Sequence, residues 1–148
     1  MPTSSIIYNS WKAALASGTE NWNLSQFKVT LVGSAYSAAA SHVYASAFSG
    51  AELSSVSFTG GFSGTMRKML SGTSAVVSQA SNVAQLLGPL IVTWSAMSAG
   101  TAMGLVVLRE SGTDALSPLV GYWDTSTIST AGGNLTVSWP ATGLIQLS

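Results

Sequence analysis

The chain has 148 residues, and alanine, serine, threonine and glycine together supply 74 of them. Only 7% of the residues are charged, five basic and five acidic, whereas an ordinary soluble domain carries roughly 25%. Disorder is excluded, because 47% apolar residues can bury enough surface to offset the chain entropy. Zero net charge excludes a basic surface for nucleic acid or an anionic membrane. We expect one domain over residues 1–148.

The absence of cysteine excludes disulfides, thiolate catalysis and cysteine-ligated zinc. The longest weakly polar stretch, residues 84–97, is about 14 residues long and contains Gly88 and Pro89, so it is too short and too broken to span a bilayer. Polar residues at 8–10 interrupt the apolar start of the chain. We therefore expect no signal peptide.

One helix is predicted near the start of the chain, at about residues 6–17. Ile7, Trp11 and Leu15 recur at helical spacing, a serine at position 4 or 5 precedes them as a cap, and Gly18 follows. A helix this short is not stable alone in water, so we expect its apolar stripe to pack against a sheet.

Strands are predicted for the rest of the chain. Phe27, Val29 and Leu31 alternate with polar residues, which indicates a half-buried strand. Further segments rich in β-branched and apolar residues predict strands at 74–78, 89–94, 102–110, 118–124, 135–139 and 143–147. Residues 103–108 are apolar on both faces, so we expect a central strand there. The fold class is therefore mainly β: an antiparallel β-sandwich or jelly roll with one packed N-terminal α-helix.

Residues with catalytic or metal-binding chemistry are few. His42 is the one histidine, and Asp114 or Asp124 could join it and a serine in a triad, but no Gly-x-Ser-x-Gly elbow occurs. Glu110, Asp114 and Asp124 could together bind a hard cation, yet they lack the alternate spacing of a calcium loop. We expect His42 to be structural and the carboxylates to be solvated. No catalytic residue, cofactor or metal is predicted.

A glycine cluster at residues 60–64 precedes Arg67 and Lys68. Glycines let backbone amides approach a phosphate, but the spacing matches neither the Walker nor the dinucleotide-binding pattern. We interpret the cluster as a glycine-rich hairpin. The two adjacent cations are expected to meet an acidic patch on a partner.

The aromatic residues fall into two groups. Those at periodic apolar positions are expected in the core: Trp11, Phe27, Trp94 and Trp139. Those among small residues in loop-like segments are expected to anchor an interface: Trp22, Tyr36, Tyr44, Phe48 and Phe62. Stacking on a sugar would use the same second group.

The low charge predicts a subunit that works inside an assembly. A globular protein of 15.1 kDa exposes about 7,000 Å² of surface, so ten charged residues give roughly one per 700 Å². Near-zero net charge promotes association, and interface cores are depleted of charge. We expect a homo-oligomer, with a monomer covered in Ser and Thr as the alternative. The segments 34–49 and 71–81 are expected to contact neighbouring subunits.

Six segments, in this order, carry a resemblance to a known family: residues 8–18, 27–36, 104–113, 117–124, 133–139 and 143–147. Together they resemble small virion proteins of tailed bacteriophages, which are encoded among head and tail genes. The resemblance implies a non-enzymatic structural protein that is made in the host cytoplasm and located on the capsid surface.

By this resemblance the protein is a capsid decoration or cement protein, with the major capsid protein or other virion subunits as its partners. Two alternatives stay open. It could be a structural part of the neck or tail, or a receptor- or glycan-binding part of a tail fibre. A third hypothesis, a hydrolase that uses His42, comes from the residues alone.

Overall fold

The fold is given by a computed structural model, which describes residues 4–23, 26–48, 50–53, 67–78, 83–89, 91–139 and 144–147. The predicted glycine-rich hairpin at 60–64 lies outside these residues. Among the described residues, no helix is long and apolar enough to cross a membrane.

A five-stranded antiparallel sheet forms the middle of the molecule. Its strands, in spatial order, are β1 (Ser4–Ile7), β8 (Leu119–Thr130), β7 (Gly100–Arg109), β2 (Phe27–Val32) and β3 (Lys68–Met69). The run of apolar residues at 103–108 lies in β7, which is flanked by β8 and β2. The prediction of a central strand there is confirmed.

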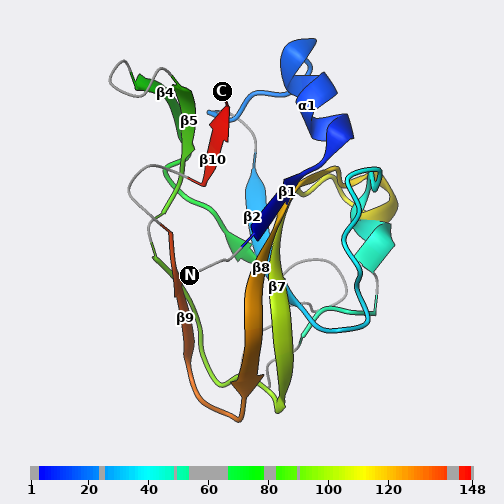
Figure 1. Ribbon diagram of the computed structural model, residues 1–148, viewed down its shortest axis with the longest axis vertical. Helices are drawn as coiled ribbons and strands as arrows, with labels where there is room; N and C mark the ends of the chain where they lie inside the picture. The colour runs from blue at the N-terminus through cyan, green and yellow to red at the C-terminus, as the bar shows by residue number, and fades with distance from the viewer. Residues whose placement is uncertain are drawn as a thin grey trace.

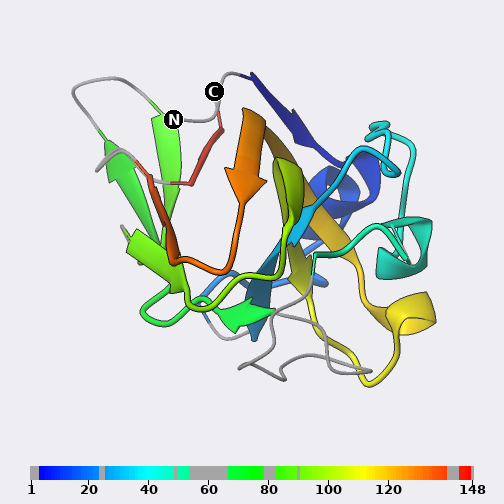
Figure 2. The same cartoon turned by 90° about the horizontal axis from the view of Figure 1, so that it is seen from below.

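Five further strands lie on one side of this sheet, and we call them the outer layer (Figures 1 and 2). Three form a sheet in the order β10 (Ile145–Leu147), β5 (Val83–Leu87) and β4 (Ser74–Ser78), and the other two, β6 (Ile91–Trp94) and β9 (Leu135–Ser138), pair with each other. All of these pairings are antiparallel. The two layers make the chain a β-sandwich, as predicted.

The other side of the five-stranded sheet is covered by loops and, among the described residues, by two short 3-10 helices (Figure 2). These helices are η1 (Ala45–Phe48) and η3 (Asp114–Leu116). The α-helix of the described residues, α1 (Asn9–Ala16), lies beyond the end of β1 (Figure 1).

The helix begins later than predicted. Residues 4–7, which were expected to contain the helix cap and its first turn, form β1, and Ile6 and Ile7 pair with Tyr122 and Gly121 of β8. The backbone hydrogen bonds of a sheet edge are therefore formed where a serine cap was expected, and the residue before the helix, Tyr8, makes no side-chain cap.

Most predicted strands are confirmed. The segment 74–78 coincides with β4, and the other predicted strands correspond to β2, β6, β7, β8, β9 and β10 with shifted ends. The largest shift is in β8, which continues to Thr130 instead of ending at Asp124. Three short strands, β1, β3 and β5, were not predicted.

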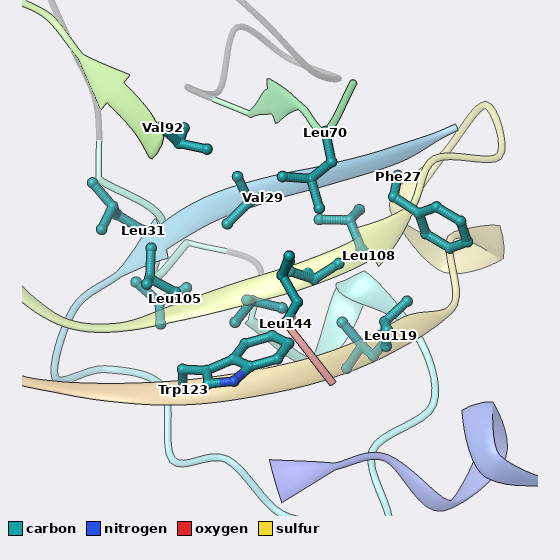
Figure 3. Packing of buried hydrophobic residues seen from close by; sticks show 14 of the residues in the cluster. Phe27, Val29, Leu31, Leu70, Val92, Leu105, Leu108, Leu119, Trp123 and Leu144 are labelled. Atoms are coloured by element: carbon teal, nitrogen blue, oxygen red, sulfur yellow. The ribbon is translucent and has the colours of Figure 1, made fainter. Parts of the chain in front are cut away.

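The core lies between the two layers (Figure 3). Val29, Leu31 and Leu105 of the five-stranded sheet are fully buried and face Val92 of β6 and Leu144.

At one end of this core, aromatic rings replace aliphatic side chains. Trp11 of α1 meets Phe27 edge to face with 5.3 Å between ring centroids, and Trp22 stacks on Phe27 at 4.3 Å. Trp94 and Trp139 are buried in the outer layer. The prediction that Trp11, Phe27, Trp94 and Trp139 are core residues is therefore confirmed.

Candidate interaction surface

Four of the residues expected at an interface lie inside the chain. Trp22, Tyr36, Phe48 and Arg67 are between 1% and 6% exposed. The expectation that they anchor a partner is therefore wrong. The small-residue surroundings of Trp22 and Tyr36 indicated loops correctly, and Phe48 lies in η1 instead. These segments fold back over the sheets and bury their large side chains.

The other expected interface residues have different positions. Tyr44 is 43% exposed and lies between η1 and the start of β8, where Val43 and Leu116 are also exposed. Lys68 is partly exposed on β3. Phe62 lies outside the described residues. For Tyr44 and Lys68 an interface role stays a prediction, as it does for the segments 34–49 and 71–81.

A chain of buried polar groups accounts for the histidine. The hydroxyls of Tyr8 and Tyr36 are 2.7 Å apart, and the Tyr36 hydroxyl is 3.0 Å from Nδ1 of His42. Burial raises the pKa of Tyr8 above its ordinary value, and its hydrogen bond with Tyr36 raises this pKa further. Burial also raises the pKa of Tyr36. These hydroxyls therefore stay protonated and join the 33–42 loop to the start of α1.

Arg67 is the centre of a buried ion cluster. Its Nε and Nη2 donate to the two carboxylate oxygens of Glu52 at 2.9 and 2.8 Å, and its Nη1 donates to Asp114 at 2.7 Å. The guanidinium also lies 5.5 Å from the ring centroid of Phe48. Burial lowers the pKa of Arg67, but the hydrogen bonds with Glu52 and Asp114 outweigh it and raise the pKa above its ordinary value. The cluster joins Arg67 to the 50–53 segment and to η3.

The three carboxylates considered as a metal site have separate partners. Glu110 pairs with Lys28, Asp114 pairs with Arg67, and Asp124 accepts a hydrogen bond from the Ser126 backbone amide at 2.8 Å. Within the described part of the chain, no group of three or more His, Asp or Glu residues could hold a metal ion. The structure therefore does not gather these carboxylates into one cation site, and Nδ1 of His42 faces the Tyr36 hydroxyl instead of a carboxylate.

Most of the charge of the molecule is neutralised internally. All ten charged residues lie among the described residues, and four ion pairs use seven of them. Besides the Arg67 and Lys28 pairs, Arg109 binds Glu20 through contact of Nε with Oε1 at 2.7 Å. The surface therefore carries even fewer unpaired charges than the composition indicates.

The charged residues are also confined to two parts of the sequence. All ten lie in residues 12–68 and 109–124, whereas residues 69–108 and 125–148 contain none. The two uncharged segments build every strand of the outer layer (Figure 2). One whole side of the sandwich is therefore free of charge. The positions of the charged residues along the sequence indicate this uncharged side, whereas the overall composition does not.

The outward face of this layer combines hydroxyls, amides and single apolar side chains. Along β6, Val92 and Trp94 point inward, whereas Ile91 and Thr93 are exposed. Thr93 lies opposite Thr136 of β9, and their hydroxyl oxygens are 3.0 Å apart. The exposed positions of the other three strands likewise carry only neutral side chains.

A small cavity lies at the turn between β8 and β9. It has a volume of about 170 Å³, and its lining includes Met97, Thr130, Asn134 and Leu135. Ligand sites usually measure about 300–1,000 Å³ and contain converging polar groups. This cavity is smaller and has no charged lining residue, so the outer layer is the stronger candidate for a functional surface.

Comparison with known protein families, with curated proteins and with solved structures gives no match to this chain.

Proposed function

We propose that this protein is a non-enzymatic structural subunit of a tailed-bacteriophage virion. In this proposal it is a decoration or cement protein that binds the major capsid protein on the assembled head. The observation that carries the proposal is the charge-free outer layer, because it is an extended surface with no ion to desolvate on contact.

Three physical features favour broad contact through this layer. Interface cores are depleted of charged residues, as this layer is. Short side chains such as Ser, Thr and Ala lose little rotamer entropy when they are buried. The strands also hold the surface in a fixed shape, so little backbone entropy is lost on binding.

The mechanism would be binding linkage. A subunit that binds the assembled shell but not its free components stabilises the shell by RT ln(1 + [L]/Kd), which is about 2.7 kcal/mol per site at a ligand concentration of 100 Kd. A capsid repeats each site by symmetry, so the contribution recurs over the whole shell.

The test mixes the purified protein with undecorated heads and measures their disassembly temperature by calorimetry. The wild type is expected to raise this temperature. Ser138→Lys places a charge on the outer layer and should weaken the effect. Ser17→Lys places the same charge at the end of α1, outside the outer layer and outside the segments 34–49 and 71–81, and should not; both serines are exposed. Absence of binding at micromolar concentration, or equal loss in both variants, would contradict the proposal.

A second candidate is a receptor- or glycan-binding part of a tail fibre, or a neck or tail subunit. The exposure of Tyr44 beside Val43 and Leu116 is the observation that favours it, since an exposed tyrosine can stack on a sugar or anchor a protein contact. Binding on a glycan array that disappears with Tyr44→Ala would favour this candidate over cement. Trp22, also considered for this role, is 2% exposed and does not contribute to such a surface.

A further inference from the structure

Strand β4 is an edge strand with main-chain groups that point away from its sheet. Successive residues of an antiparallel strand direct these groups alternately to the two sides. Leu86 of β5 accepts a hydrogen bond from the Leu144 amide on the β10 side, so its register partner Ala75 directs its own groups away from β5. Accordingly, the Ala75 amide donates to the side chain of Asn23 at 2.8 Å. Val77, two residues further, has the same orientation.

The features that usually block an exposed edge are missing from β4. Proteins protect edges with charged side chains, proline, bulges or a covering segment. Residues 74–78 contain neither a charge nor proline, and their register with β5 is continuous. The edge strand β3, in contrast, carries Lys68. The contact of Asn23 with Ala75 is the one cover that the described residues provide.

We propose that β4 pairs with β4 of a second copy of this chain, antiparallel and about a two-fold axis at Val76. This register places Val76 opposite its own copy, Ala75 opposite Val77, and Ser74 opposite Ser78. The outward main-chain groups of Ala75 and Val77 then meet as hydrogen-bonded pairs. The three-stranded sheet of each copy becomes half of a six-stranded sheet.

The absence of charged residues around β4 favours a second copy of this chain as its pairing partner. A two-fold contact brings the same patch of both subunits together, so any charge near the axis meets a like charge. The outer layer has none to oppose the pairing. Asn23 gives up its bond to Ala75 in the pair, which makes its side chain a competitor of dimer formation. This pairing does not depend on a role in the virion.

Sedimentation equilibrium of the full chain tests the pairing. The wild type is expected to show a reversible monomer–dimer equilibrium. Val76→Lys places two like charges opposite each other and should weaken the dimer at least about tenfold, whereas Val76→Thr keeps the branched shape and should not. Ile91→Lys, on β6 of the same layer, is the matched control and should leave the dissociation constant of the dimer unchanged. A monomer at all concentrations, or equal effects of Val76→Lys and Ile91→Lys, would overturn the proposal.

Cross-linking tests the register without a change of charge. The chain has no cysteine, so Val76→Cys introduces a single thiol. Residues at a non-hydrogen-bonded antiparallel pair have Cα atoms about 4.5 Å apart, within disulfide range. We expect Val76→Cys to form a disulfide dimer under mild oxidation much faster than Ile91→Cys. Equal rates would refute the register.

The competing contact gives a gain-of-function test. Asn23→Ala frees the Ala75 amide in both copies. Each freed amide removes a competing hydrogen bond that accounts for a factor of about five, so the dimer, which contains two, should tighten about 25-fold. An unchanged or weaker dimer with a thermal unfolding curve like that of the wild type would show that Asn23 does not compete with the pairing.

Discussion

Replacing Arg67 by methionine is expected to destabilise the protein strongly. The Arg67 side chain is 0% exposed, and its partners Glu52 and Asp114 are 7% and 28% exposed. Methionine fills a similar volume but leaves the Glu52 carboxylate buried without its cation. Breaking a buried ion pair from one side costs about 3–5 kcal/mol. That is a large share of the roughly 5–15 kcal/mol that stabilise a typical domain.

Urea unfolding followed by tryptophan fluorescence measures this loss. Lys12→Met, which removes an exposed cation from α1, is the control and should change the free energy of unfolding by less than about 0.5 kcal/mol. The double variant Glu52→Met with Arg67→Met removes both charges of the closest pair. It should recover much of the stability, because an apolar replacement of a buried ion pair is often close to neutral.

The refuting result is a loss from Arg67→Met no larger than that from Lys12→Met. Arg67 would then be a solvated cation, and the expectation that it meets an acidic partner would regain its basis. A double variant that is less stable than either single variant would show that the ion cluster stabilises the fold beyond the burial of its atoms.

Three further predictions concern the surroundings of Tyr8, Tyr36 and Tyr122. Gly104→Ala should cost about 1–3 kcal/mol in urea unfolding, because its new Cβ would lie 2.3 Å from Cε2 of the Tyr122 ring; a neutral result would mean that the ring moves freely. Stability should fall as the pH rises above about 10. In the unfolded chain the Tyr8 hydroxyl loses its proton near its ordinary pKa of about 10, whereas in the folded chain its raised pKa keeps it protonated, so alkaline pH favours unfolding. Tyr8→Phe should make this alkaline decline in the urea midpoint shallower. His42→Ala should lower the free energy of unfolding by about 1–2 kcal/mol, because the Tyr36 hydroxyl loses a partner; no change would show that water replaces the imidazole.

The parts of the fold that local pattern determines were predictable. Alternation in β2 and β9 and the doubly apolar run in β7 depend on residues adjacent in sequence, and each became a strand in the expected place. The buried Trp11 and Phe27 followed from the same periodicity.

The errors occur where tertiary contact overrides local pattern. Ile7 continues the helical spacing of Trp11, yet the edge of β8 binds residues 4–7 as a strand. Tyr36 and Phe48 lie among Ser and Ala, which indicated a loop, but nothing local shows that the loop folds onto the sheet. Arg67 is buried only because Glu52 and Asp114, 15 and 47 residues away, converge on it.

The candidate surface could have been predicted from the positions of the charged residues in the sequence, although not from the composition alone. A count of ten charges is the same whether they are scattered or segregated. Their positions show two uncharged segments, and the topology then places both segments in one layer. Pairing seven charges elsewhere removes the repulsion that would otherwise keep subunits apart at short range. The outer layer is thus the side on which close contact has the lowest electrostatic cost, whatever partner occupies it.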